Sequence, residues 1–242
     1  SSGSLSLTIV NDLVIPLGDV EQFINENDGM IRRVLSLRTG VDLLDPLYYN
    51  MSKKIFVVYG HYNTKKSFNA EVRDVFIKEA KKLGHQIDLI NLHEEKPIPF
   101  YDGSEPSEQI LDYRKRLESS DVLFMISPCY NLRATAILEN WIDLTLAPKW
   151  FFSFKRLVGN WGYPVAGAMK NRTAIMSMSY GGNWFSIQTW FQNIPFRRIK
   201  AGVLKLGGMK TTYLRFYEVL PGMPKNKFER YMEKVKKLVR QL

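Results

Sequence analysis

The sequence predicts an α/β fold, a doubly wound sheet of five parallel strands with helices on both faces. From Lys54 onward, short apolar runs alternate with segments whose apolar residues recur at helical spacing. Several of these runs are apolar throughout, which is typical of strands that are covered by helices above and below. Ligands of such sheets bind beyond the carboxyl ends of the strands, so the loops there form the candidate site.

The elements of this predicted domain follow one another in a regular order. The expected strands are 54–60, 86–92, 121–127, 172–179 and 211–219. The first expected helix begins after Ser67, carries its apolar residues at helical spacing and stops at Gly84. Further helices are expected at 105–119, at 134–146, around 185–192 and at 225–241.

Residues 1–50 do not continue this alternation. They contain a strand-like run at 7–17, a helical pattern from Asp19 to Leu37 and a turn at Asp45-Pro46. No motif in residues 1–50 indicates a particular catalytic or binding activity. We therefore expect an N-terminal extension over 1–50, which is a docking segment, an oligomerisation arm or sequence added by cloning or start-site choice, followed by one domain over 51–242.

Composition narrows the class of protein. With 242 residues, 45% of them hydrophobic, the chain can bury a sizeable core. No apolar run approaches the roughly 20 residues of a membrane span, and the first residues lack the pattern of a signal peptide. Cys129 is the one cysteine, which excludes an internal disulfide and a multi-cysteine metal site. We expect a cytoplasmic protein with no metal.

The net charge of +10 is concentrated at the C-terminus. Lys and Arg number 3 against 7 Asp and Glu in residues 1–50, 13 against 14 in 51–148, and 18 against 3 in 149–242. This excess is either a solvated surface or an attraction for an anionic ligand such as a phosphorylated dinucleotide. No nucleic-acid-binding motif accompanies the charge, so we expect no nucleic-acid partner.

Three loops at the carboxyl ends of the strands carry the candidate chemistry. The first reads GHYNTKKSFN (60–69), in which a serine can cap the helix and a histidine can donate to an anion. The second, SPCYNLRAT (127–135), has backbone N–H groups that can address the edge of a flat ring. The third, SYGG (179–182), has paired glycines that let backbone approach a ligand closely.

The order and spacing of these loops resemble the flavodoxin-like NAD(P)H:quinone oxidoreductases, the family of DT-diaphorase and the small bacterial quinone and azo-compound reductases. The matching residues are His61, Ser67, Phe68 and Asn69 in the first loop, then Pro128, Ala136, Leu138, Trp141, Asp143 and the aromatic run 150–152, and the SYGG loop. The chain departs from the family in the second loop, where Tyr130 or Asn131 replaces a tryptophan, Thr135 replaces a proline and Arg133 stands at a position of small residues.

The resemblance implies a sheet order of 2-1-3-4-5 and a noncovalent FMN or FAD, with NAD(P)H as hydride donor. It implies a homodimer that reduces quinones or similar small acceptors by ping-pong hydride transfer. The cofactor-binding residues it implies are His61, Ser67, Phe68, Asn69, Pro128, Cys129, Tyr130, Asn131, Leu132, Ser179, Tyr180, Gly181 and Gly182. Trp150, Phe152 and Trp184 would line the substrate pocket, and Tyr180 is the candidate proton donor.

Three other functions were weighed against this one. A nucleophilic enzyme built on Cys129 is disfavoured, because a phosphatase signature needs its arginine six positions after the cysteine, whereas Arg133 lies at four. A one-electron carrier is disfavoured by the basic charge. A flavin-binding regulatory subunit with little turnover, docking through residues 1–50, is the alternative to the enzyme.

Overall fold

The computed structural model of the protein describes residues 7–10, 13–16 and 52–242. In the first part, β1 (Leu7–Val10) and β2 (Leu13–Pro16) pair antiparallel. The strand-like run predicted at 7–17 therefore folds as two short strands. The helix predicted from Asp19 to Leu37 and the turn at Asp45-Pro46 lie outside the described residues, and the role of residues 1–50 stays a prediction.

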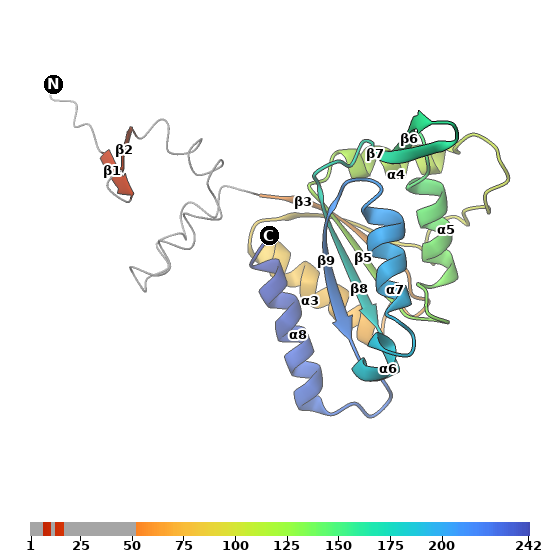
Figure 1. The fold of residues 1–242 in the computed structure, drawn as a ribbon. Coiled ribbons are helices and arrows are strands. Elements are labelled where there is room, and N and C mark those ends of the chain that lie inside the picture. Colours follow the sequence, from red (N-terminus) through yellow and green to blue (C-terminus); the bar gives the residue numbers. More distant parts are fainter. Residues whose placement is uncertain (1–6, 11–12, 17–51) are drawn as a thin grey trace, which may run out of the picture. The chain divides into compact units, whose positions relative to one another are not determined.

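The second part, residues 52–242, contains the predicted parallel sheet of five strands (Figure 1). The strands are β3 (Lys54–Tyr59), β4 (Gln86–Asn91), β5 (Val122–Pro128), β8 (Thr173–Ser179) and β9 (Lys210–Phe216). They lie in the order β4-β3-β5-β8-β9, and all four neighbouring pairs are parallel. The α/β fold class is confirmed, and β3, β5 and β8 are adjacent.

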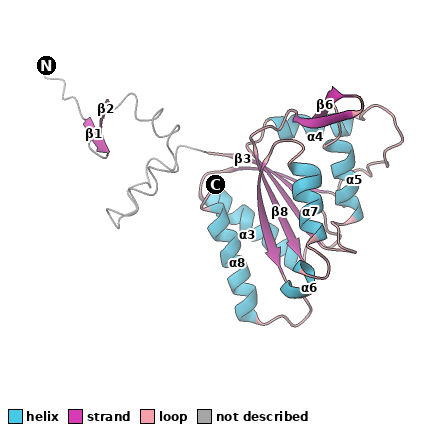
Figure 2. Cartoon of the chain, in the orientation of Figure 1, coloured by secondary structure: helices cyan, strands magenta, loops and turns pink. Residues whose placement is uncertain are grey.

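Helices connect these strands (Figure 2). They are α3 (Phe68–Lys82), α4 (Glu108–Glu118), α5 (Ala136–Thr145), α6 (Trp184–Gln188), α7 (Ile194–Ile199), a π-helical turn η1 (Lys200–Leu204) and α8 (Lys225–Val239). The helix predicted around 185–192 is shorter than expected. Gln192 and Asn193 have positive φ angles of 47° and 52°, which interrupt the helix before α7 restarts at Ile194-Pro195.

A β-hairpin between α5 and β8 was not predicted. Its strands β6 (Phe152–Val158) and β7 (Trp161–Ala166) pair antiparallel and form a sheet of their own. The turn between them contains Gly159, whose φ angle is +54°. A Gly-Asn pair between two apolar runs is a recognised hairpin signal, so the sequence did carry the information.

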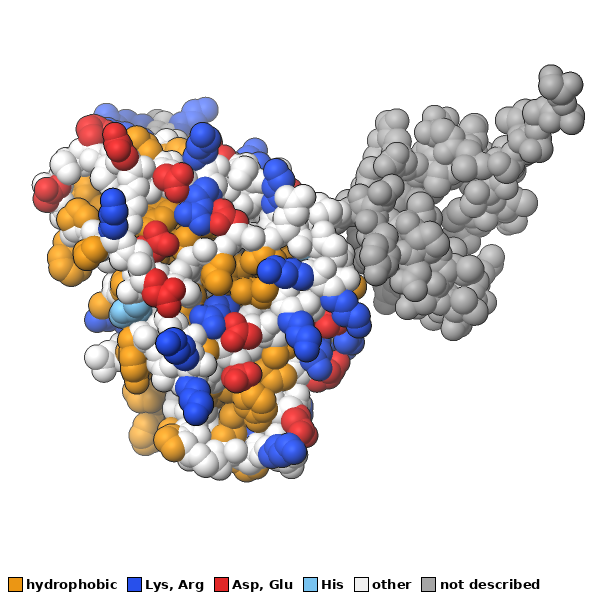
Figure 3. Space-filling model, turned by 180° about the vertical axis from the view of Figure 1, so that it is seen from behind, with side chains coloured by type: hydrophobic (Ala, Val, Ile, Leu, Met, Phe, Trp, Pro, Cys, Tyr) orange, Lys and Arg blue, Asp and Glu red, His pale blue; other side chains and the backbone are white. Residues whose placement is uncertain are grey.

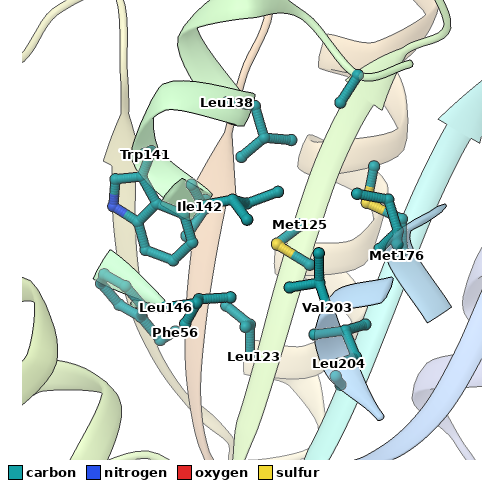
Figure 4. Packing of buried hydrophobic residues seen from close by; sticks show 14 of the residues in the cluster. Phe56, Leu123, Met125, Leu138, Trp141, Ile142, Leu146, Met176, Val203 and Leu204 are labelled. Atoms are coloured by element: carbon teal, nitrogen blue, oxygen red, sulfur yellow. The ribbon is translucent and has the colours of Figure 1, made fainter. Parts of the chain in front are cut away.

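The sheet buries side chains on both of its faces. On one face Phe56 and Leu123 pack with Trp141 of α5 and with residues of α4 and η1, as the close-up in Figure 4 shows in part. On the other face Val57 and Phe124 pack with residues of α3 and α8. Alternate side chains of one strand thus enter two different cores, which explains why β5 is apolar throughout. None of the helices in residues 52–242 combines the length and hydropathy of a membrane span.

Candidate functional site

Three loops meet at the carboxyl edge of the sheet, because they follow the adjacent strands β3, β5 and β8. Hydrogen bonds tie them together. The backbone N–H of Cys129 donates to the Ser179 carbonyl at 2.8 Å, which joins the second loop to the third. The Asn69 side chain donates to the Ser179 hydroxyl at 3.0 Å, which joins the start of α3 to the third loop. The sequence-predicted loops are therefore neighbours in the fold.

The first loop, 60–67, presents the N-terminus of α3 to this edge. The Ser67 hydroxyl accepts from the Ala70 N–H at 3.1 Å and so caps the helix. The same hydroxyl donates to the Asn63 carbonyl at 3.1 Å, and the Tyr59 hydroxyl donates to that carbonyl at 2.7 Å. The Asn63 side-chain oxygen accepts from the Lys66 N–H at 2.8 Å. The loop is thus held in shape by its own donors around one asparagine.

His61 links the first loop to the second. Its ring is buried, with Nδ1 3.3 Å from the Asn63 carbonyl and Nε2 3.3 Å from the Tyr130 hydroxyl. Burial lowers the pKa of the His61 ring, against a smaller raising effect of the Asn63 carbonyl, so the ring is neutral at pH 7. The hydrogen-bond partners then assign the proton to Nδ1, and Nε2 accepts from Tyr130.

The second loop turns sharply between Tyr130 and Arg133, whose backbone groups bond each other in both directions at 2.9 and 3.1 Å. Asn131 and Leu132 between them have positive φ angles of 50° and 59°. Two consecutive left-handed residues define a tight primed turn, which is uncommon for leucine. The Leu132 N–H donates to the Cys129 sulfur, whereas within residues 52–242 no hydrogen bond uses the N–H of Asn131, which is free for a ligand.

Thr135 fastens the end of the second loop to the first. Its hydroxyl donates to the Gly60 carbonyl at 2.5 Å, and its N–H donates to the Ser127 hydroxyl at 3.0 Å. A proline here would lack both the N–H and the hydroxyl. The departure from the family pattern at this position is therefore compensated by two specific bonds. Sequence reasoning did not identify this role, nor those of Tyr59 and Asn63.

The third loop separates a buried tyrosine from two exposed glycines. Tyr180 is 1% exposed, its ring stacks on Tyr217 at 5.2 Å, and its hydroxyl lies 3.2 Å from that of Tyr213. Burial raises the pKa of Tyr180 well above its ordinary value. Gly181 and Gly182 are exposed, and a Cβ on either would meet its nearest neighbour only at 3.5 Å. This geometry gives no support to Tyr180 as a proton donor and leaves the glycine backbone open.

The other predicted site residues are divided between the edge and the core. Pro128 ends β5 and is buried, and Cys129 is half-buried beside it. Burial raises the pKa of the Cys129 thiol to about 11, so a reactive thiolate is scarce at neutral pH. The ring of Phe68 points away from the loops, since it packs on Phe216 and Phe228.

The three predicted pocket aromatics are not brought together within one copy of the chain. The Trp150 indole N–H donates to Glu118 at 2.8 Å, and Glu118 ends α4 at the opposite edge of the sheet. Trp150 also lines a cavity of about 730 Å³ between α4, α5 and the 98–107 loop, away from the three loops. Phe152 packs on Phe151 and Phe154, whereas Trp184 begins α6 directly after the third loop and is 59% exposed.

Comparisons with known proteins agree with this architecture. A family model described as a flavodoxin-like fold matches residues 53–242. The chain is 23% identical over 155 residues to a ribosyldihydronicotinamide dehydrogenase [quinone] of Pongo abelii. The match covers 54% of this chain and 64% of the relative, so the chain spans less than two thirds of that protein's length. It is 28% identical over 186 residues to an FMN-dependent NADH:quinone oxidoreductase of Burkholderia lata, covering 69% of this chain and 89% of the relative.

Two solved structures show the same fold. An NAD(P)H:quinone oxidoreductase from Methanothermobacter marburgensis superposes with a TM-score of 0.65 at 17% identity, over 78% of this chain and 98% of that one. An FMN-dependent NADH-azoreductase from Bacillus anthracis, solved in complex with FMN, gives a TM-score of 0.64 at 15% identity, over 78% and 98%. At these identities the likeness establishes the fold alone.

Proposed function

The chain belongs to the family with a flavodoxin-like fold, and from this membership we propose that it is a flavin-dependent NAD(P)H oxidoreductase that reduces quinones or similar acceptors. The observation that carries the proposal is the meeting of the three matched loops at one edge of the sheet, tied by the Asn69–Ser179 and Cys129–Ser179 bonds. Two relatives whose names specify a quinone, the Pongo abelii dehydrogenase and the Burkholderia lata oxidoreductase, support the choice of acceptor.

The residues at this edge fit a flavin by the chemistry of their donors. The N-terminus of α3 and its Ser67 cap suit a phosphate, since helix N-termini attract anions. In the described chain the N–H groups of Gly181 and Gly182 enter no hydrogen bond, and no side chain crowds them. That of Asn131 is free in the same way. We favour FMN, because the Burkholderia lata relative and the Bacillus anthracis structure are both named for it.

When bound, a flavin would supply the redox chemistry, which is hydride transfer from NAD(P)H in one half-reaction and to the acceptor in a second, as in a ping-pong mechanism. The chain binds and orients it. The Gly181 and Gly182 N–H groups would donate to the ring edge where negative charge grows, and fixed donors of this kind stabilise such charge without rearranging. The Asn131 N–H would address the other edge. His61, neutral and anchored by Asn63, would hold the first loop against the second.

We further propose that the protein is a cytoplasmic homodimer. Each copy keeps Trp150 and Phe152 away from its own three loops, so an active site that uses these aromatics needs them from a second copy. The β6–β7 hairpin supports an interface between copies, because Phe154, Val158 and Trp161 on it are 67%, 75% and 69% exposed. Exposed apolar clusters of this kind mark interaction surfaces.

The test is anaerobic reduction of the protein reconstituted with FMN. We expect NADH or NADPH to bleach the flavin absorbance, and a quinone added afterwards to restore it. Bleaching that no quinone reverses would contradict the proposed acceptor and favour a regulatory flavoprotein. A flavin that neither nucleotide reduces would contradict the oxidoreductase itself.

A further inference from the structure

A cluster of exposed apolar side chains borders the third loop. We call it the aromatic rim; it consists of Trp184, Phe185, Trp190, Phe191, Ile194 and Leu220, which are 59%, 63%, 84%, 40%, 45% and 56% exposed. Figure 1 places α6 at the lower end of the sheet, where β8 and β9 finish, and Figure 3 shows from behind that hydrophobic side chains gather toward this lower end. So many large apolar groups in one place are not explained by ordinary surface composition.

The rim is one surface because backbone bonds fold its segments together. The Phe191 N–H donates to Ser186 at 3.1 Å and the Ile194 N–H donates to Phe191 at 3.0 Å, which makes 184–194 a compact double turn. The Glu218 N–H donates to Gly182 at 3.0 Å, which brings the loop that carries Leu220 beside the glycines. The rim therefore stands next to the candidate site without belonging to its donor set.

The charges around the rim are mostly positive, because the carboxylate beside Leu220, that of Glu218, is paired with Lys227 at 2.7 Å. Between Asp143 and Glu218 the sequence contains no Asp or Glu but eleven Lys and Arg. Two of these cations, Arg197 and Lys200, lie on α7 and η1 directly after the rim, are exposed, and form no salt bridge within residues 52–242. An apolar cluster with uncompensated cations beside it is complementary to an apolar layer with an anionic surface.

Two other partners fit less well. A second copy would bring the same patch to the interface, since a two-fold interface uses one surface of both subunits, and it would add a second Arg197 and Lys200 without an anion to compensate them. Single-stranded nucleic acid would stack on the aromatic rings, but Ile194 and Leu220 have no ring on which a base can stack. Aromatic and aliphatic groups together are what the boundary between lipid headgroups and acyl chains accepts.

We propose that the aromatic rim docks the protein on an anionic lipid bilayer. This inference goes beyond the proposed function and does not depend on it. Trp184, Phe185 and Trp190 enter the headgroup boundary, and Arg197 and Lys200 contact lipid phosphates. Docking in this orientation turns the carboxyl edge of the sheet toward the membrane, where acceptors with apolar tails are dissolved.

The test is co-sedimentation of the full chain with vesicles, independent of flavin content. We expect the protein to bind vesicles of phosphatidylcholine mixed with phosphatidylserine, and to bind vesicles of phosphatidylcholine alone at least about tenfold more weakly. Added salt should abolish binding to the mixed vesicles, because it shortens the Debye length from ~30 Å at 0.01 M to ~3 Å at 1 M. The double variant Phe185→Ser with Trp190→Ser should bind the mixed vesicles at least about tenfold less. Both side chains are largely exposed, so the variant should fold, which circular dichroism checks.

Matched controls distinguish binding through the rim from nonspecific adsorption to vesicles. Phe100→Ser removes an aromatic that is 81% exposed on another loop, and Lys81→Glu with Lys82→Glu reverses two exposed cations at the end of α3. Both should keep vesicle binding, whereas Arg197→Glu with Lys200→Glu should lose it. Failure to bind either vesicle at low salt overturns the proposal. The proposal is also overturned if a rim variant binds vesicles normally but has a changed oligomeric state in light scattering. It is overturned as well if the wild-type protein binds poly(U) and not vesicles.

Discussion

The first and second loops of the site reach a fixed shape in different ways. The first keeps the residues of its family pattern, and its donors converge on Asn63 and on the cap of α3. The second lacks the tryptophan and proline of that pattern and is shaped by a left-handed turn at Asn131 and Leu132. One loop is thus specified by side-chain hydrogen bonds and the other by backbone conformation. The Asn131 N–H remains available to a ligand despite the substitutions, because the turn leaves it without a partner within residues 52–242.

This difference predicts that the second loop depends most on its attachment to α5 and α7. The buried Glu139 accepts from the Ala134 N–H at 3.1 Å and pairs with Arg198. We expect Arg198→Ala to lower the free energy of unfolding by about 2–3 kcal/mol, because it leaves the Glu139 carboxylate buried without its cation. This value is below that of a fully buried ion pair because Arg198 is partly exposed and solvent screens it. Urea titration measures this.

The neighbouring Arg197→Ala is the matched control and should change stability by less than about 0.5 kcal/mol, since Arg197 is exposed. Equal effects of the two variants would show that the Glu139–Arg198 pair does not anchor the loop.

The position of the first loop depends on the hydrogen bonds between Asn69 and Ser179 of the third loop. Asn69 is 4% exposed and exchanges hydrogen bonds with the Ser179 hydroxyl at 3.0 and 3.2 Å. We expect Asn69→Ala to cost about 1–3 kcal/mol of stability, because a buried hydroxyl loses its partner. Thermal unfolding followed by circular dichroism provides the value, and a second substitution, Ser179→Ala, should then add little. Full additivity of the two would mean that the pair does not interact.

The pH dependence of stability tests the link between the first two loops. The folded-state pKa of His61 is lowered by burial, so the unfolded chain binds more protons below the ordinary histidine pKa of about 6.5. Its contribution to stability is therefore complete above that pH and is lost as the pH falls from 6.5 through the lower folded value. His61→Gln should flatten this part of the stability profile, measured by urea titration between about pH 5 and 7.5.

His85, whose pKa burial also lowers, should keep its own share of the slope in that variant. An unchanged profile in His61→Gln would contradict the burial of a neutral ring between the loops.

The smallest expected effect concerns the turn of the second loop. Asn131 is exposed and has a φ angle of 50°, a region that glycine occupies without strain and asparagine with little. Asn131→Gly should raise stability by no more than about 0.5 kcal/mol, whereas Asn131→Val should lower it by about 1–2 kcal/mol because β-branched residues resist this conformation. Equal melting temperatures of the valine and glycine variants in thermal unfolding would contradict the left-handed conformation of Asn131.

Sequence reasoning predicted the parallel sheet because buried strands and amphipathic helices leave periodic patterns, as in β5 and α3. It also found the three loops, because each follows a strand directly. It missed α7 and the β6–β7 hairpin, which depend on local backbone features such as Asn193 and Gly159. It assigned Tyr180 to the site because adjacency to a glycine pair does not reveal that the ring is buried against Tyr217.

Titration of the flavin-free protein with FMN is the measurement that tests the central claim most directly. We predict that FMN fluorescence is quenched to saturation at one FMN per chain, and that Ser67→Ala together with His61→Ala weakens the affinity by about 1–3 kcal/mol, because the first loop, whose helix N-terminus faces the phosphate, loses the cap and the link to the second loop that hold it in shape. FMN and FAD that both remain fully fluorescent in the presence of excess protein would contradict a cofactor cradle at the carboxyl edge of the sheet.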